Sequence, residues 1–137
     1  MIDVIDLKKT FGDLEVLKGI NVPINKGDIV VVIGPSGSGK STFLRCLNCM
    51  EDPTSGSIIF NGVDIADMRV DINIHRRHMG MVFQHFNLFN NMTVIENIMM
   101  APVYVRCKEL KKAKRKGTLA PDAPKTKAEI KAQAREE

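Results

Sequence analysis

One segment of eight residues, Gly34 to Ser41, constrains the fold of this chain more than any other part of the sequence. It reads Gly-Pro-Ser-Gly-Ser-Gly-Lys-Ser and fits the phosphate-binding loop pattern G-x-x-x-x-G-K-[ST] without a mismatch. Before it, Asp28 to Ile33 contains the run Ile-Val-Val-Val-Ile, which is apolar on both faces and predicts a buried parallel strand. After it, Thr42 to Met50 carries apolar residues at helical spacing. Strand, loop and helix in this order are the context that the pattern requires.

The residue types of the loop suit a nucleoside triphosphate. Its glycines lack the Cβ atoms that would hold the backbone away from a phosphate, so successive N–H groups can converge on the anion. The helix N-terminus adds partial positive charge, Lys40 can reach the β- and γ-phosphates, and the Ser41 hydroxyl can ligate Mg²⁺. An ordinary Gly/Ser-rich turn is the alternative. We predict that the nucleotide is held by Gly34, Pro35, Ser36, Gly37, Ser38, Gly39, Lys40, Ser41 and Thr42.

Positive charge is concentrated in the last quarter of the chain. Residues 1–105 hold nine Lys/Arg and eleven Asp/Glu, whereas residues 106–137 hold eleven and five. Ordering the 21 residues from Gly117 onward would cost roughly 30 kcal/mol, against about 1.5 to 3 kcal/mol for burying Ile130. We therefore expect 106–137 to be a mobile or transiently helical basic tail, with any helix starting at Thr126 and capped by Thr126 and Glu129.

Composition excludes some classes of protein. The longest apolar runs, around Ile29 to Ile33 and Ile98 to Val105, are far below the ~18 residues that span a bilayer. No signal-peptide pattern opens the chain, and an odd count of three cysteines favours reduced thiols over a disulfide framework. Cys46 and Cys49 form a C-x-x-C without a second pair, which favours helix residues over a zinc site. We expect a cytoplasmic protein.

The remaining strands are predicted from alternation and turn residues. Ile2 to Leu7 and Ile20 to Ile24 alternate apolar and polar residues, as half-exposed antiparallel strands do. Asn61-Gly62 predicts a type I′ hairpin turn between Ser57 to Phe60 and Val63 to Ile65, because both central residues of that turn need positive φ.

Further along the chain, one more strand and one helix are expected. Gly80 to Phe83 is a short apolar stretch that predicts a strand. Thr93 and Glu96 form a capping box that predicts a helix start, and Pro102 should kink or end that helix.

The order of these features up to Gln84 resembles the ATP-binding cassette (ABC) family of transporter nucleotide-binding subunits. Phe11 to Asn21, Phe43 to Asn48 and Val82 to Phe89 further resemble the subfamily that serves polar amino acid importers. The resemblance covers about residues 1–105, which we take as the N-terminal part of the ATP-binding domain. It implies an α/β fold: a P-loop NTPase core with a partial parallel sheet and flanking helices, plus a small antiparallel β-subdomain.

The resemblance also implies further site residues. Phe11 falls at the aromatic position that stacks on adenine, with Val16 as a second apolar contact; two ordinary core residues are the alternative. Gln84 falls at the Q-loop position, which touches Mg²⁺ together with Ser41. ATP and Mg²⁺ are the implied cofactors.

A docking surface is implied as well. Phe86, Leu88 and Phe89 fall where the family meets a transmembrane coupling helix, although Asn90-Asn91 departs from the Pro-His common at that place. A hydrophobic loop packed on its own domain is the alternative.

The family's signature Leu-Ser-Gly-Gly-Gln, Walker B strand and switch histidine are not found in this sequence. We therefore expect an incomplete, truncated cassette with negligible hydrolysis and with unpaired apolar edges at Ile29 to Ile33. Complete relatives couple ATP binding and hydrolysis to import of polar amino acids. They assemble with permease subunits and a second cassette at the inner face of the plasma membrane. Two alternatives stay open: a small P-loop kinase, and a non-hydrolytic fragment that binds nucleotide, or nucleic acid through Lys108 to Lys116.

Overall fold

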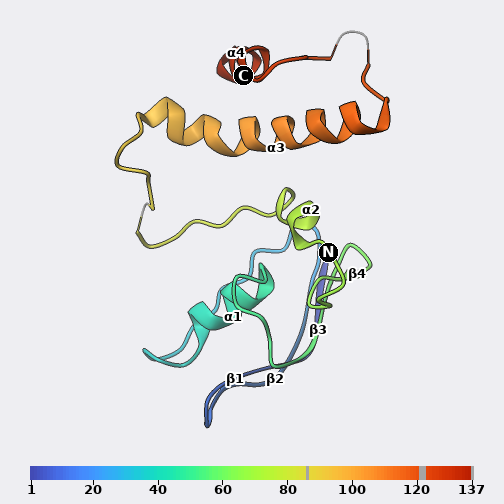
Figure 1. Ribbon diagram of the computed structural model, residues 1–137. Coiled ribbons are helices and arrows are strands. Elements are labelled where there is room, and N and C mark those ends of the chain that lie inside the picture. Colours follow the sequence, from blue (N-terminus) through green and yellow to red (C-terminus); the bar gives the residue numbers. More distant parts are fainter. Residues whose placement is uncertain (86, 121–122, 137) are drawn as a thin grey trace. The chain divides into compact units, whose positions relative to one another are not determined.

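The computed structural model describes residues 1–85, 87–120 and 123–136, and the chain divides into two compact units, Met1–Val82 and Phe83–Glu137 (Figure 1). The first unit contains an antiparallel sheet of four strands in the order β2-β1-β3-β4. These are β1 (Ile2–Phe11), β2 (Leu14–Ile24), β3 (Ser55–Phe60) and β4 (Val63–Asp64). The sheet agrees with the antiparallel subdomain expected from the alternating segments.

Two tight turns join strands of the sheet, and the second of them lies at the residues predicted to turn. Gly12, with φ of 57°, turns β1 into β2, and Phe11 pairs with Leu14 across the turn. Asn61 and Gly62 have φ of 50° and 84°, which confirms the predicted turn between β3 and β4. Asp64 fastens this second hairpin, because its Oδ1 accepts hydrogen bonds from the N–H groups of Ile58 and Ala66, each at 3.1 Å.

The core lies between one face of the sheet and the helix α1 (Lys40–Leu47). α1 is shorter than predicted, since the helix ends at Leu47 and Met50 is half exposed. α2 (Ile72–Arg76) is tied to the end of α1 by Arg76, whose guanidinium donates to the carbonyls of Asn48 and Cys49. The buried cluster consists of Val4, Leu7, Leu17, Phe43, Cys46, Cys49, Ile58, Phe60 and Ile65.

Because of Cys49, this core should lose stability at alkaline pH. Burial raises the pKa of its thiol from 9.0 to about 11, with the positive charge of Arg76 opposing the rise. The thiol donates to the Ile65 carbonyl at 3.2 Å. Because the folded pKa is the higher one, stability is fully present below pH 9 and is lost as pH rises toward 11, by about 1 kcal/mol at pH 10.

Denaturant unfolding of wild type and Cys49→Ala between pH 7 and 10.5 measures this loss. The fall in stability should be smaller in Cys49→Ala, whereas Cys107→Ala, which changes a less buried thiol, should behave like wild type. An identical pH profile in wild type and Cys49→Ala would contradict the prediction.

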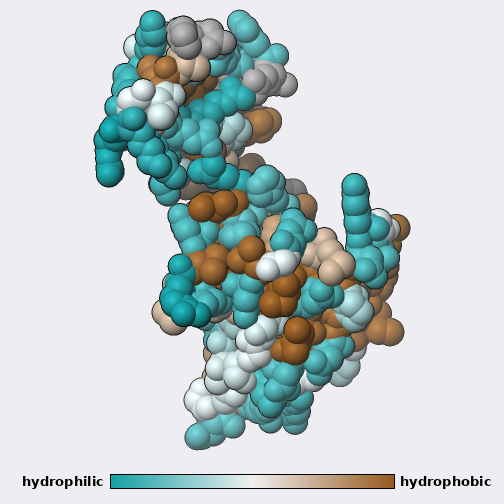
Figure 2. Space-filling view, turned by 90° about the vertical axis from the view of Figure 1, so that its right-hand side faces the viewer, coloured by the Kyte–Doolittle hydropathy of each residue, from teal (hydrophilic) through white to brown (hydrophobic). Residues whose placement is uncertain are grey.

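The α/β fold class is confirmed, but its parallel part is not formed as strands in the described residues. The predictions of strands at Asp28 to Ile33 and Gly80 to Phe83 are therefore wrong for this structure. Ile29 and Ile33 are 94% and 86% exposed, and Figure 2 shows several apolar side chains at the surface of this unit. A strand is held by hydrogen bonds to a neighbouring strand, and the four described strands pair only among themselves.

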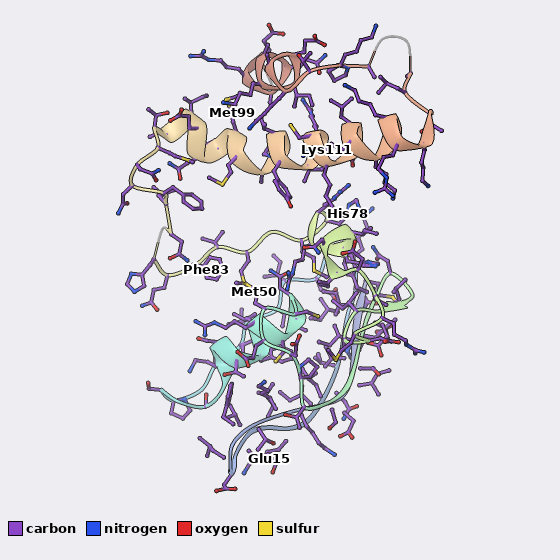
Figure 3. All side chains as sticks on the ribbon, viewed as in Figure 1. Glu15, Met50, His78, Phe83, Met99 and Lys111 are labelled. Carbon is purple, nitrogen blue, oxygen red and sulfur yellow. The ribbon has the colours of Figure 1, made fainter. Side chains whose placement is uncertain are left out.

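The second unit begins its main helix, α3 (Val94–Lys116), at the predicted capping box. The Thr93 hydroxyl accepts from the N–H of Glu96, and the Glu96 carboxylate accepts from the N–H of Thr93 at 2.9 Å, which lowers the pKa of Glu96. Of the two outcomes predicted at Pro102, the helix end is wrong, because Pro102 lies inside α3 and the helix continues to Lys116, with Gly117 as its left-handed C-cap at φ of 65°. A kink at Pro102 stays a prediction. Figure 3 labels Met99 and Lys111 along this helix.

α4 (Lys127–Glu136) packs on α3 and is seen end-on in Figure 1. Ile130 is fully buried, and the N–H of Glu129 donates to the hydroxyl of Thr126 at 3.2 Å, as predicted for the start of this helix. The boundary predicted at residue 105 falls inside α3. The division of the chain into 1–105 and 106–137 is not tested by this and stays a prediction. Within the described residues, no helix has both the length and the apolar character needed to cross a membrane.

Candidate nucleotide-binding site

The predicted loop leads directly into the N-terminus of α1. Gly39 is the N-cap residue, and no side chain among the described residues caps this end of the helix. The first N–H groups of a helix have no acceptor within it, and the helix dipole places partial positive charge there. An uncapped N-terminus behind a glycine-rich loop is therefore a set of N–H donors suited to an anion.

Two glycines give the loop its shape. Gly37 and Gly39 have φ of 79° and 85°, in a region that side chains with a Cβ rarely adopt. A Cβ on Gly39 would also lie 2.9 Å from Val16 Cγ1 and 3.1 Å from Leu17 Cδ2. Glycine at 39 thus lets the loop lie against β2, and it brings Val16 beside the loop.

Lys40 lies over the loop that it follows. Its Nζ donates to the carbonyls of Gly34 at 2.9 Å and Pro35 at 2.7 Å, and it lies 3.5 Å from the Ser38 hydroxyl. The N–H of Ser38 also donates to the Pro35 carbonyl at 3.3 Å, which closes the turn. A phosphate that binds the Lys40 ammonium group must replace these carbonyls as its hydrogen-bond acceptor. An anionic oxygen is a stronger acceptor for an ammonium group than a carbonyl oxygen is.

Three further predicted site residues carry hydroxyl groups. The hydroxyl residues Ser36 and Ser41 are exposed, and Thr42 is half-buried in the first turn of α1. A hydroxyl oxygen suits Mg²⁺, which takes oxygen ligands and keeps several waters. The described residues contain no group of three His, Cys, Asp or Glu side chains close enough together to hold a metal ion.

Phe11 has the exposure that a base platform needs. It lies at the end of β1, next to the Gly12 turn, and pairs with Leu14, the residue before Glu15, which Figure 3 labels. Of its surface, 46% is exposed. The Nζ atom of Lys9 lies 4.7 Å from the centre of the Phe11 ring. The structure thus places Phe11 at the surface, whereas the alternative of an ordinary core residue would bury it.

Gln84 belongs to the second unit and is exposed. Its predicted role beside Ser41 therefore stays a prediction. Leu88 and Phe89 of the same unit are 58% and 52% exposed. The part of the predicted docking surface that falls on Phe86 lies outside the described residues.

One neighbour of the site was missed by the sequence analysis. Lys9 and Phe11 are two residues apart on a strand, so their side chains point to the same face. This spacing could have predicted the contact, but Lys9 matches no motif by itself.

Comparison with known proteins identifies the family of the chain. The sequence profile of the family described as "ABC transporter" matches residues 17–136. The chain belongs to the ABC transporter family. The match extends beyond residue 105, where we expected the resemblance to end.

Relatives in this ABC transporter family are similar over most of the chain. It is 54% identical over 99 residues to the glutamine transport ATP-binding protein GlnQ of Geobacillus stearothermophilus, covering 72% of this chain and 41% of that protein. It is 54% identical over 113 residues to the arginine transport ATP-binding protein ArtM of Bacillus subtilis, covering 82% and 47%. The chain thus spans less than half the length of these relatives.

Solved ABC structures share the fold. The dimeric structure of MJ0796, a bacterial ABC transporter cassette, superposes with a TM-score of 0.67 at 28% identity, covering 98% of this chain and 68% of that one. A post-hydrolysis dimer of the same cassette, bound to ADP and Pi, gives a TM-score of 0.66 over the same shares. These likenesses show that the chain shares the fold of ABC transporter cassettes over nearly its whole length.

Proposed function

We propose that this chain binds ATP with Mg²⁺ and belongs to the ATP-binding subunit of an importer of polar amino acids. The observation that carries the nucleotide part is the N-terminus of α1, which no described side chain caps, behind a loop in which Gly37 and Gly39 have positive φ. The amino acid part rests on relatives described as glutamine and arginine transport proteins, each 54% identical.

The residues of the first unit divide the work of holding a nucleotide. The loop backbone and Lys40 bind the phosphates, and the Ser41 hydroxyl provides an oxygen for Mg²⁺. Phe11 offers its exposed ring to the base, and Val16 offers an apolar contact between the base and the loop. The nucleotide supplies a triphosphate, whose binding and hydrolysis change the state of a transporter.

In the assembled protein, Gln84 would join Ser41 at the metal. The exposed side chains of Leu88 and Phe89 would face permease subunits, and a second cassette would be the other partner. This assembly would place the chain at the cytoplasmic face of a membrane.

Calorimetric titration of the chain with ATP in the presence of Mg²⁺ tests the proposal. We expect weak, saturable binding of one nucleotide per chain, which inorganic tripolyphosphate should compete away. A chain that is folded by circular dichroism but takes up neither ATP nor tripolyphosphate would contradict it.

Replacing Phe11 measures the contribution of the base platform. Phe11→Ala should lower ATP affinity by about 0.5 to 1.5 kcal/mol, roughly two- to tenfold, because it removes aromatic stacking. Phe11→Tyr keeps the ring and should be nearly neutral. If Phe11→Ala is folded and binds ATP as tightly as wild type, the ring does not contact the base.

A further inference from the structure

Lys9 is a charged residue that the proposed phosphate and metal contacts do not use, yet its side chain is only 12% exposed. Its Nζ lies 2.7 Å from Glu51 Oε1 and 2.7 Å from the carbonyl of Asp52, to which it donates a hydrogen bond. The same Nζ lies 4.7 Å from the centre of the Phe11 ring. One ammonium group therefore contacts a carboxylate, a backbone carbonyl and an aromatic face.

These contacts join two distant parts of the first unit. Lys9 and Phe11 belong to β1, whereas Glu51 and Asp52 follow α1, just after Met50, which Figure 3 labels. Thr54 strengthens the junction, because its hydroxyl accepts from the N–H of Thr10 at 2.9 Å and its own N–H donates to the Lys8 carbonyl at 2.8 Å. Hydrogen bonds and an ion pair thus hold the end of β1 against the segment that follows α1.

The Phe11 ring is contacted by the ammonium group of Lys9 and still remains partly exposed. A cation within about 6 Å of a ring centre is attracted to the ring face, and here the cation is also fixed by two oxygen atoms. Phe11 nevertheless keeps 46% of its surface exposed. An aromatic side chain that is already held in place loses less conformational freedom when a second ring stacks on it.

We propose that Lys9, fixed by Glu51 and Asp52, is the positioning residue for base binding. It covers one face of Phe11 and presents the other face to a purine. Lys9 itself contacts no part of the nucleotide. This inference rests on the proposed function, since it requires that Phe11 receives the base.

The test compares a nucleotide with a ligand that has no base. Lys9→Met keeps the length of the side chain and removes its charge. We expect it to weaken ATP binding about three- to tenfold and to leave the affinity for inorganic tripolyphosphate unchanged. Lys9→Arg, which can still pair with Glu51 and stack on Phe11, should bind ATP within about twofold of wild type. In a Phe11→Ala background, Lys9→Met should have no further effect on ATP binding.

Each other outcome has a distinct meaning. Equal loss of ATP and tripolyphosphate affinity in Lys9→Met would show a structural role and would overturn the inference, as would unchanged ATP affinity. If Lys9→Met does not fold, Glu51→Gln loosens the same ammonium group, and unchanged ATP affinity in that variant would overturn the inference too. Failure of the wild-type chain to bind ATP while it binds tripolyphosphate would instead remove base recognition from the proposed function, and this inference with it.

Discussion

Lys40→Ala should lower the affinity of the chain for ATP with Mg²⁺ by about ten- to a hundredfold. The substitution removes charge-assisted hydrogen bonds to phosphate oxygens, which contribute about 1.5 to 3 kcal/mol. The ammonium group is already placed at the loop for this contact, because Nζ lies 2.9 Å from the Gly34 carbonyl and 2.7 Å from the Pro35 carbonyl. The contribution of Lys40 to ATP affinity is therefore the difference in free energy between its hydrogen bonds to phosphate oxygens and those to the loop carbonyls.

Calorimetry on three variants separates the loss of the Lys40 phosphate contact from the general effect of removing one positive charge from the protein. Lys18→Ala removes an exposed lysine of β2 and should bind ATP as wild type does. Lys40→Arg keeps the charge but is longer and planar, so it should recover only part of the affinity. Chemical unfolding of each variant without nucleotide shows whether the loop has kept its structure. Equal ATP affinity in wild type and a folded Lys40→Ala would contradict the proposed phosphate contact.

Turns and helix starts could be predicted from the sequence because the residues that decide them act on their immediate neighbours. Asn61 and Gly62 both have positive φ, as their turn requires, and Thr93 and Glu96 exchange the hydrogen bonds of a capping box. The conformation of the phosphate loop is likewise determined by residues of the loop itself. Gly37 and Gly39 allow its backbone angles, and the pattern fixes where the lysine follows.

The segment Ile29 to Ile33 shows where such reasoning fails. Its apolar composition predicts a buried strand, but composition does not supply a pairing strand. In this structure it has no strand assignment, and each of its side chains is at least 38% exposed. The interpretation of the segment as a strand depended on a neighbouring strand to pair with, and none of the described strands pairs with it.

The helix end predicted at Pro102, as an alternative to a kink, is the opposite error, in which a local rule was given too much weight. A proline inside a helix costs about 3 kcal/mol, since it removes one N–H donor and crowds the preceding turn. Residues 106–116 are mostly Lys, Arg, Glu, Leu and Ala, which favour helix. The helix therefore continues past Pro102 to Lys116.

The candidate site was predictable in its motif and not in its surroundings. The loop residues follow from one continuous pattern, whereas the network around Phe11 joins Lys9 to Glu51, which is 42 positions away in the sequence. No spacing rule connects residues so far apart, and only the fold of β1 against the segment after α1 brings them together.

Phosphate release from ATP by the purified 137-residue chain should stay at background. Hydrolysis of a phosphoanhydride needs groups that orient the attacking water and neutralise the developing charge, and the resemblance assigns these roles to Walker B carboxylates and a signature segment absent from this sequence. Each such group commonly contributes about a hundredfold or more, so we expect a rate at least ~10⁴-fold below that of a complete cassette.

The carboxylates nearest to the loop in the sequence are engaged elsewhere. No Asp or Glu lies between Asp28 and Glu51. Asp28 Oδ2 accepts from the N–H of Asn25 at 2.7 Å, and Glu51 pairs with Lys9. The chain should therefore bind ATP at protein concentrations where phosphate release is undetectable, which parallel calorimetry and phosphate assays on one preparation can measure. Phosphate release well above background that disappears in Lys40→Ala would contradict this prediction, because it would mean that a carboxylate outside the expected Walker B position activates water at this loop.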